Sequence, residues 1–267
     1  MTDVVVRGEP FRIGTCLSKA LAVYFANFVS FTAMGLLVLV PGFMVLMMFF
    51  GNLLANLGPA LLTAEGRLLL TPLTVAGFLA AFIAVLALQY LLIGTVVYGA
   101  LQYLQGNTPT AAAALAQGLK RSVPIAGLAV ATTVLVGAGL LLLVVPGIVI
   151  ALMLSVAVPV QMVEGPGVFA SLSRSRELTK GLRWQLLSVF LAAIAGCIAV
   201  TALVTLPFDF LLPREGAMTL AGGIIETAIQ LFTTVFLAVL VAVVYHELRV
   251  AKDGVSTAQL AAAASAR

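Results

Sequence analysis

Charged residues are absent from most of this chain and gather at the borders of long apolar stretches. Four stretches have no charged residue inside them: those between Lys19 and Glu65, between Arg67 and Lys120, between Arg121 and Glu164, and between Arg183 and Asp209. The hydrocarbon core of a bilayer is about 30 Å thick, and one helical span needs about 20 apolar residues. Each stretch therefore has room for at least one span, and the pattern predicts an all-α integral membrane protein.

Basic residues divide the polar segments into two classes. All of the 14 Lys and Arg residues except Arg67 and Arg214 lie in the N-terminus, around position 120, between positions 174 and 183, or in the C-terminus. Because Lys and Arg are retained on the cytoplasmic side of a membrane, both termini are predicted to be cytoplasmic and the number of spans to be even. About six transmembrane helices satisfy this condition, at about 29–56, 72–103, 124–145, 147–163, 185–212 and 219–247.

The third and fourth predicted spans are separated only by Pro146-Gly147. Proline and glycine here allow either a tight hairpin or a bend in one long helix. A single span would place the basic segments on either side of it on opposite faces of the membrane, so the charge pattern favours the hairpin. Pro41-Gly42 lies in a run too short for two full spans, which indicates a kinked or partly re-entrant first span.

Short amphipathic stretches precede three of the apolar runs, at about 11–27, 109–122 and 166–181. In the first, Ile13, Leu17, Leu21 and Phe25 recur at intervals of four, while Arg12 and Lys19 lie on another side. This spacing is typical of a helix that lies in the membrane interface. The recurrence is explained either by an internal repeat or by the placement of basic residues before spans in any such protein.

Composition agrees with one membrane domain that covers residues 1–267. The chain is 62% hydrophobic and 9% charged, whereas a soluble domain has about 25% charged residues. The two cysteines, Cys16 and Cys197, are expected to be free thiols, and no cleavable signal peptide is expected. The net charge of +4 is spread over four segments, so nucleic-acid binding is not predicted.

Three sequence elements form a recognisable pattern: a Pro-Gly break with Pro and Glu at the end of the next helix, the segment "SLSRSRELTKGLRW", and the C-terminal "VYHELRVAKDG". Together they resemble one bacterial family, which is named after the membrane domain of glycerophosphoryl diester phosphodiesterase. The resemblance extends from about 144 to 190 and from 245 to 254, and is only general before residue 100. It implies a helical bundle in the bacterial inner membrane. The residues that carry it are Pro146, Gly147, Pro159, Glu164, Arg174, Ser175, Leu178, Thr179, Gly181, Trp184, Tyr245, Leu248, Arg249 and Gly254.

Phosphodiesterase chemistry is not expected despite the name of that family. Such enzymes use a soluble barrel with carboxylate metal ligands and paired histidines, whereas this chain has a single histidine, His246. The sequence contains no glycine-rich phosphate loop, no nucleophile elbow and no metal-spaced cluster. We therefore expect no enzyme activity, no cofactor and no metal site.

Two sets of polar residues remain as candidate sites. Glu226 and Gln230 lie one turn apart inside the last span, where an ionisable side chain is costly and indicates function by default. Alternatively, Glu226 reaches the outer headgroups or pairs with Arg214. The second set is basic and aromatic, and is expected to contact lipid headgroups or a partner protein: Arg174, Arg176, Lys180, Arg183 and Trp184.

These observations predict a non-catalytic membrane protein that uses basic interfacial helices to contact lipids, chiefly anionic ones, or partner membrane proteins. Each Lys or Arg near an anionic surface contributes about 1 kcal/mol of attraction. The alternative is a small transporter or channel in which Glu226 and Gln230 line a path between broken helices.

Overall fold

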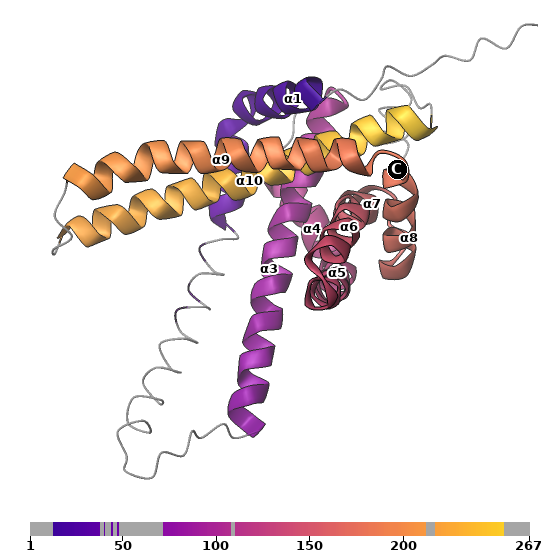
Figure 1. Cartoon of the computed structure of the whole chain (residues 1–267), viewed down its shortest axis with the longest axis horizontal. Coiled ribbons are helices and arrows are strands. Elements are labelled where there is room, and N and C mark those ends of the chain that lie inside the picture. The colour runs from indigo at the N-terminus through magenta and orange to yellow at the C-terminus, as the bar shows by residue number, and fades with distance from the viewer. Residues whose placement is uncertain are drawn as a thin grey trace, which may run out of the picture.

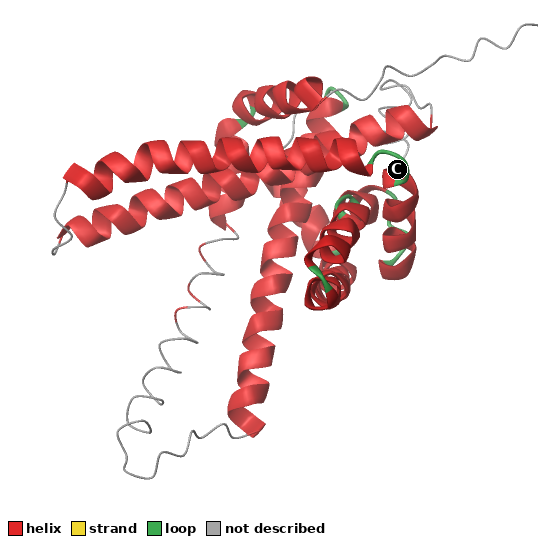
Figure 2. Cartoon of the chain, viewed as in Figure 1, coloured by secondary structure: helices red, strands yellow, loops and turns green. Residues whose placement is uncertain are grey.

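The computed structural model describes residues 13–37, 40, 44, 47, 72–107, 110–211 and 217–253. Every regular element in these ranges is a helix, which confirms the all-α prediction (Figures 1 and 2). The labelled helices are α1 (Ile13–Ala26), α3 (Pro72–Leu104), α4 (Ala111–Lys120), α5 (Ser122–Leu142), α6 (Val144–Leu154), α7 (Ala157–Val163), α8 (Val168–Thr179), α9 (Arg183–Leu211) and α10 (Ala217–Asp253).

Five segments of these helices are long and apolar enough to cross a membrane. They are Leu79–Leu104, Ser122–Leu142, Val144–Val163, Arg183–Pro207 and Gly222–Asp253. A further pair, Ile13–Ala26 and Phe28–Leu37, is bent by 80° and raises the number of candidate spans in the described residues to six at most. These spans indicate that the protein is a multi-pass helical membrane protein. Most of the predicted first span, 29–56, including Pro41-Gly42, lies outside the described residues.

Helices α5 and α6 form the predicted hairpin, but the chain turns at Leu143 instead of at Pro146-Gly147. Leu143 is extended, with φ −163° and ψ 149°. The Arg121 guanidinium at the start of α5 donates to the carbonyl of Gln161 in α7 at 2.7 Å. The start of α5 and the end of α7 therefore lie next to each other, as expected for a helical hairpin. Pro146 is tolerated inside the first turn of α6 because the N–H groups there have no intrahelical partner.

The predicted fourth span, 147–163, is divided into α6 and α7. The break falls at Ser155 and Val156, and Pro159 explains its position. A proline ring clashes with the carbonyl four residues earlier, which here belongs to Ser155, and proline lacks the N–H that would bond to it.

Buried side chains concentrate at one end of the long helices. In α3 and α10 they lie in the C-terminal halves, where Leu92, Val96, Leu240 and Leu248 are fully buried. The opposite ends carry exposed apolar side chains, as expected for surfaces that face lipid. Figure 1 shows α9 and α10 side by side and crossing α3, whose N-terminal half projects away from the other helices.

Polar contacts join the helices at this packed end. Lys19 of α1 forms an ion pair with Glu247 of α10 at 2.8 Å, and the Lys252 ammonium donates to the carbonyl of Lys180 at 2.7 Å. The segments near positions 19, 121, 180 and 252, which the charge pattern assigns to one side of the membrane, therefore meet at one end of the bundle.

Candidate functional site

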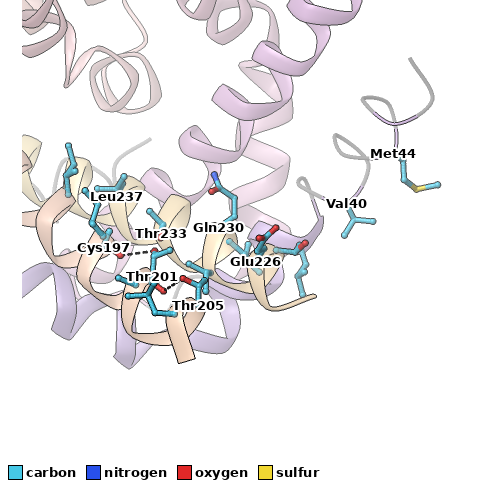
Figure 3. A pocket seen from close by; sticks show the side chains of 17 residues that line it. Val40, Met44, Cys197, Thr201, Thr205, Glu226, Gln230, Thr233 and Leu237 are labelled. Atoms are coloured by element: carbon cyan, nitrogen blue, oxygen red, sulfur yellow. Dashed lines mark hydrogen bonds between the residues drawn. The ribbon is translucent and has the colours of Figure 1, made fainter. Parts of the chain in front are cut away.

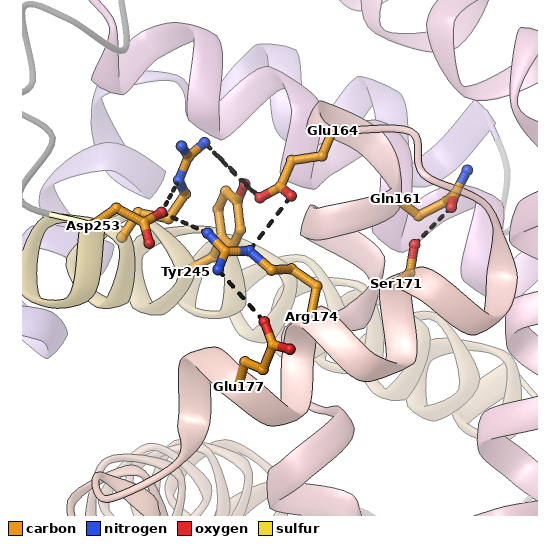
Figure 4. Close-up of polar contacts among 8 residues, drawn as sticks. Gln161, Glu164, Ser171, Arg174, Glu177, Tyr245 and Asp253 are labelled. Atoms are coloured by element: carbon orange, nitrogen blue, oxygen red, sulfur yellow. Dashed lines mark hydrogen bonds and ion pairs between the residues drawn. The ribbon is translucent and has the colours of Figure 1, made fainter.

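A polar cluster joins α7, α8 and α10, and we call it the motif cluster (Figure 4). It consists of Glu164, Arg174, Tyr245, Arg249 and Asp253. The Tyr245 hydroxyl donates to Glu164 Oε1 at 2.9 Å, and Arg174 Nη2 donates to Asp253 Oδ2 at 2.7 Å. Arg249 Nε donates to the same Asp253 oxygen at 3.0 Å. Four of these five residues, all except Asp253, are among those that carry the resemblance to the bacterial family, so distant parts of the pattern meet in one place.

The motif cluster balances its charges internally. Arg174 Nε lies 3.6 Å from Glu164 Oε2, and Arg249 Nη1 lies 3.9 Å from Glu164 Oε1, so each guanidinium faces both Glu164 and Asp253. Glu177 adds a weaker contact to Arg174 at 3.8 Å. Two cations facing two carboxylates form a clamp between α8 and α10 and leave no net charge to attract a ligand.

Arg174, which the sequence predicts to contact headgroups, is therefore held by ion pairs within the protein, and its contact with lipid stays a prediction. Partial burial acts to lower the pKa of its guanidinium, but the hydrogen bond to Asp253 and the charges of Asp253 and Glu164 outweigh burial and raise that pKa. The sequence could not show this, because Asp253 lies at the far end of the chain.

The inner face of α8 is fixed by a row of buried hydroxyl groups at Ser171, Ser175 and Thr179. Ser171 Oγ donates to Gln161 Oε1 at 2.7 Å (Figure 4), and Ser175 Oγ donates to the carbonyl of Met153 at 2.8 Å. Ser171 and Gln161 were not singled out from the sequence. The signal that could have found Ser171 is the interval of four between Ser171, Ser175 and Thr179, which places these three hydroxyl residues on one helical face.

The outer face of α8 and the start of α9 expose a mixed basic and aromatic surface. Arg176 and Lys180 are exposed, and their side chains form no ion pair with the described residues. Trp184 is 81% exposed and Phe169 is 82% exposed, whereas Arg183 is half-buried. We call Phe169, Arg176, Lys180 and Trp184 the α8 surface. Of the predicted headgroup contacts, it retains Arg176, Lys180 and Trp184.

Glu226 and Gln230 lie far from the α8 surface, at the loosely packed end of α10. They line a crevice of about 1030 Å³ between α9, α10 and the segment that begins at Phe28 (Figure 3). The α9 wall includes Cys197 and Thr201. Glu226 and Gln230 are both exposed at the surface of the protein instead of being enclosed in its core. Arg214, the alternative partner of Glu226, lies outside the described residues.

The crevice walls present few free polar groups despite their threonines. Thr201 donates to the carbonyl of Cys197 at 2.9 Å, and Thr205 donates to that of Thr201 at 3.0 Å. Thr227 likewise donates to the carbonyl of Gly223 at 2.7 Å. The carboxylate of Glu226 forms no hydrogen bond or ion pair with the described residues, so it is the principal polar group that the crevice offers.

No group of three or more His, Cys, Asp or Glu side chains in the described ranges is arranged to hold a metal ion. His246 is buried, with Nδ1 3.7 Å from Glu247 Oε1, and Glu247 is already paired with Lys19. Cys16 and Cys197 are free thiols, as expected.

Comparisons of the chain with protein-family models, with curated proteins and with solved structures found no match.

Proposed function

We propose that this protein is a non-catalytic module of the bacterial inner membrane that binds anionic lipid headgroups through the α8 surface. The observation that carries the proposal is the two-sided character of α8. Its inner face is bonded to α6, α7 and α10. On its outer face, Arg176 and Lys180 form no ion pair with any described residue, and the rings of Phe169 and, at the start of α9, Trp184 are exposed. A helix fixed in this way presents its charges without first having to become ordered.

The geometry of the α8 surface suits the membrane interface. Arg176 and Lys180 are four residues apart and lie on the same face of the helix. Trp184 follows the positive-φ turn at Gly181 (φ 86°) and lies in the first turn of α9. Tryptophan prefers the headgroup level of a bilayer, where its ring is partly apolar and partly hydrated. The two cations together supply about 2 kcal/mol of attraction to an anionic surface.

The same arrangement supports the proposed orientation, with both termini cytoplasmic. The packed end of the bundle collects the basic segments near Lys19, Arg121, Lys180 and Lys252. If that end is cytoplasmic, the α8 surface lies against the inner leaflet. The convergence of Glu164, Arg174 and Tyr245 also supports the proposed membership of the resembled family, because it gives the separated motifs a common structural role.

A transporter is less well supported by the crevice at Glu226. The crevice reaches Leu237, beyond which α10 is packed tightly: Val239, Leu240 and Val243 have no exposed surface. A transport path would need to continue through this part of the bundle. The carboxylate therefore faces a recess that is closed at its inner end, and the lipid-binding proposal accounts for more of the molecule.

The test replaces Arg176 and Lys180 by Gln in the full-length protein. Binding of a phosphatidylglycerol and of a phosphatidylcholine with the same acyl chains is measured by native mass spectrometry from one detergent. Removing the two charges removes about 2 kcal/mol of attraction, so the variant should bind the anionic lipid more weakly, by up to about 30-fold. Binding of the choline lipid should not change.

The matched control exchanges the two residues for each other's type, as R176K/K180R, which keeps both charges. This variant should bind the anionic lipid as the wild type does. Unchanged anionic-lipid binding by the R176Q/K180Q variant would refute the α8 surface as a headgroup site.

A further inference from the structure

We propose that the crevice between α9 and α10 is a second lipid site, which holds an acyl chain of a phospholipid whose headgroup carries a primary amine, with the ammonium bound by Glu226. This site is at the opposite end of α10 from the α8 surface. It differs from that surface in charge and in lipid class, and it does not depend on the function proposed for α8.

The position of Glu226 along α10 matches the far headgroup level. An α-helix rises about 1.5 Å per residue, so the distance along α10 from Glu247 to Glu226 is about 31 Å. The hydrocarbon core of a bilayer is about 30 Å thick. With α10 along the bilayer normal and Glu247, at the packed end, at one headgroup level, Glu226 lies at the other.

The depth of the crevice matches one leaflet. On α10 its lining extends from Glu226 through Gln230 and Thr233 to Leu237, residues that share one helical face. The rise between the first and last of these is about 16 Å, close to half of the hydrocarbon thickness. A tail that enters beside Glu226 would reach the closed end of the crevice near the bilayer centre.

The walls suit an aliphatic chain. Leu36 and Ile198 contribute apolar surface from two different segments. The hydroxyls of Thr201, Thr205 and Thr227 are bonded to carbonyls of their own helix. In a bilayer, an apolar recess open at the protein surface is in contact with lipid tails at very high concentration. A lipid is therefore the occupant that both the chemistry and the surroundings favour.

Charge selects the headgroup. Among the described residues, the lining contains one carboxylate and no Lys, Arg or His. A carboxylate at the edge of hydrocarbon is stabilised by a cation that also donates hydrogen bonds, because charge-assisted hydrogen bonds are about twice as strong as neutral ones. An ethanolamine ammonium has three N–H donors. A choline headgroup has the same charge and none, so the two lipids provide a direct test.

The experiment compares phosphatidylethanolamine and phosphatidylcholine with identical acyl chains, bound to the full-length protein and measured by native mass spectrometry. The wild type should prefer the ethanolamine lipid by about five- to tenfold. The Glu226→Gln variant should still bind both lipids but lose the preference, and Glu226→Asp should keep most of it. A Glu226→Gln variant with the wild-type preference would overturn the proposal.

Two further variants locate the site. Ala202→Phe places a ring in the crevice and should weaken binding of both lipids at this site, whereas unchanged binding would show that the tail lies elsewhere. The R176Q/K180Q variant should keep the ethanolamine preference. If it loses that preference instead, the amine lipid binds at the α8 surface and the crevice proposal fails, while the α8 proposal stands.

Discussion

Replacing Arg174 by Gln tests whether the motif cluster is a structural clamp. In the structure, Arg174 faces Asp253 at 2.7 Å and Glu164 at 3.6 Å, and its side chain is 30% exposed. A hydrogen bond to a charged group contributes about 1.5–3 kcal/mol, whereas exposed ion pairs contribute about 0–1 kcal/mol. Because the side chain is partly exposed, the expected loss lies at the low end of the first range, at about 1.5–2 kcal/mol.

The assay is thermal unfolding of the full-length protein in one detergent. Because 1 kcal/mol shifts the Tm of a large domain by about 2–4 °C, Arg174→Gln should lower Tm by about 3–8 °C. The matched control is Arg176→Gln, which removes the same charge two residues away from a side chain that is exposed and has no ion pair among the described residues. That variant should change stability by no more than about 0.5 kcal/mol.

A double-mutant cycle then isolates the contact itself. Arg174→Gln and Asp253→Asn should be non-additive by about 1 kcal/mol, because residues that share a hydrogen bond are energetically coupled. The clamp would be refuted if Arg174→Gln and Arg176→Gln lowered stability equally and the effects of Arg174→Gln and Asp253→Asn were additive. Arg174 would then be a surface charge that is free to contact lipid.

Three other predictions concern topology and packing. A reporter that is active only in the cytoplasm should be active when fused after Lys120 and inactive after Glu65; the reverse pair of results would overturn the orientation. Gly147→Ala should destabilise the α5–α6 hairpin by about 1–3 kcal/mol, because a Cβ there would overlap the preceding helix, while Gly137→Ala, which meets nothing within 4 Å, should be tolerated in thermal unfolding. Ser171→Ala should cost about 1–3 kcal/mol in the same assay, since it leaves a buried amide oxygen without its donor; no change in Tm would contradict this.

The sequence determined where helices form. In a bilayer the backbone must satisfy its own hydrogen bonds, so a long apolar run is restricted to helix and its length gives the extent of the element. The predicted span 72–103 corresponds to α3, Pro72–Leu104, and the predicted interfacial helix 166–181 corresponds to α8, Val168–Thr179. Charge distribution also favoured the hairpin in the third apolar run, although the turn itself lies at Leu143.

Only the tertiary structure decided what the polar side chains do. Arg174 and Arg176 are two residues apart with the same chemistry, but they point to different sides of α8, and only Arg174 meets the carboxylates of α7 and α10. Likewise, the crevice beside Glu226 is formed by residues of α9, of α10 and of the segment that begins at Phe28, which are far apart in the sequence. Hydropathy indicates how strongly each segment partitions into the membrane, but it carries almost no information about the rotation of a helix about its axis. The rotation and crossing of each helix are set by contacts between side chains far apart in the chain, and these contacts decide which charges are paired and which remain free to bind a ligand.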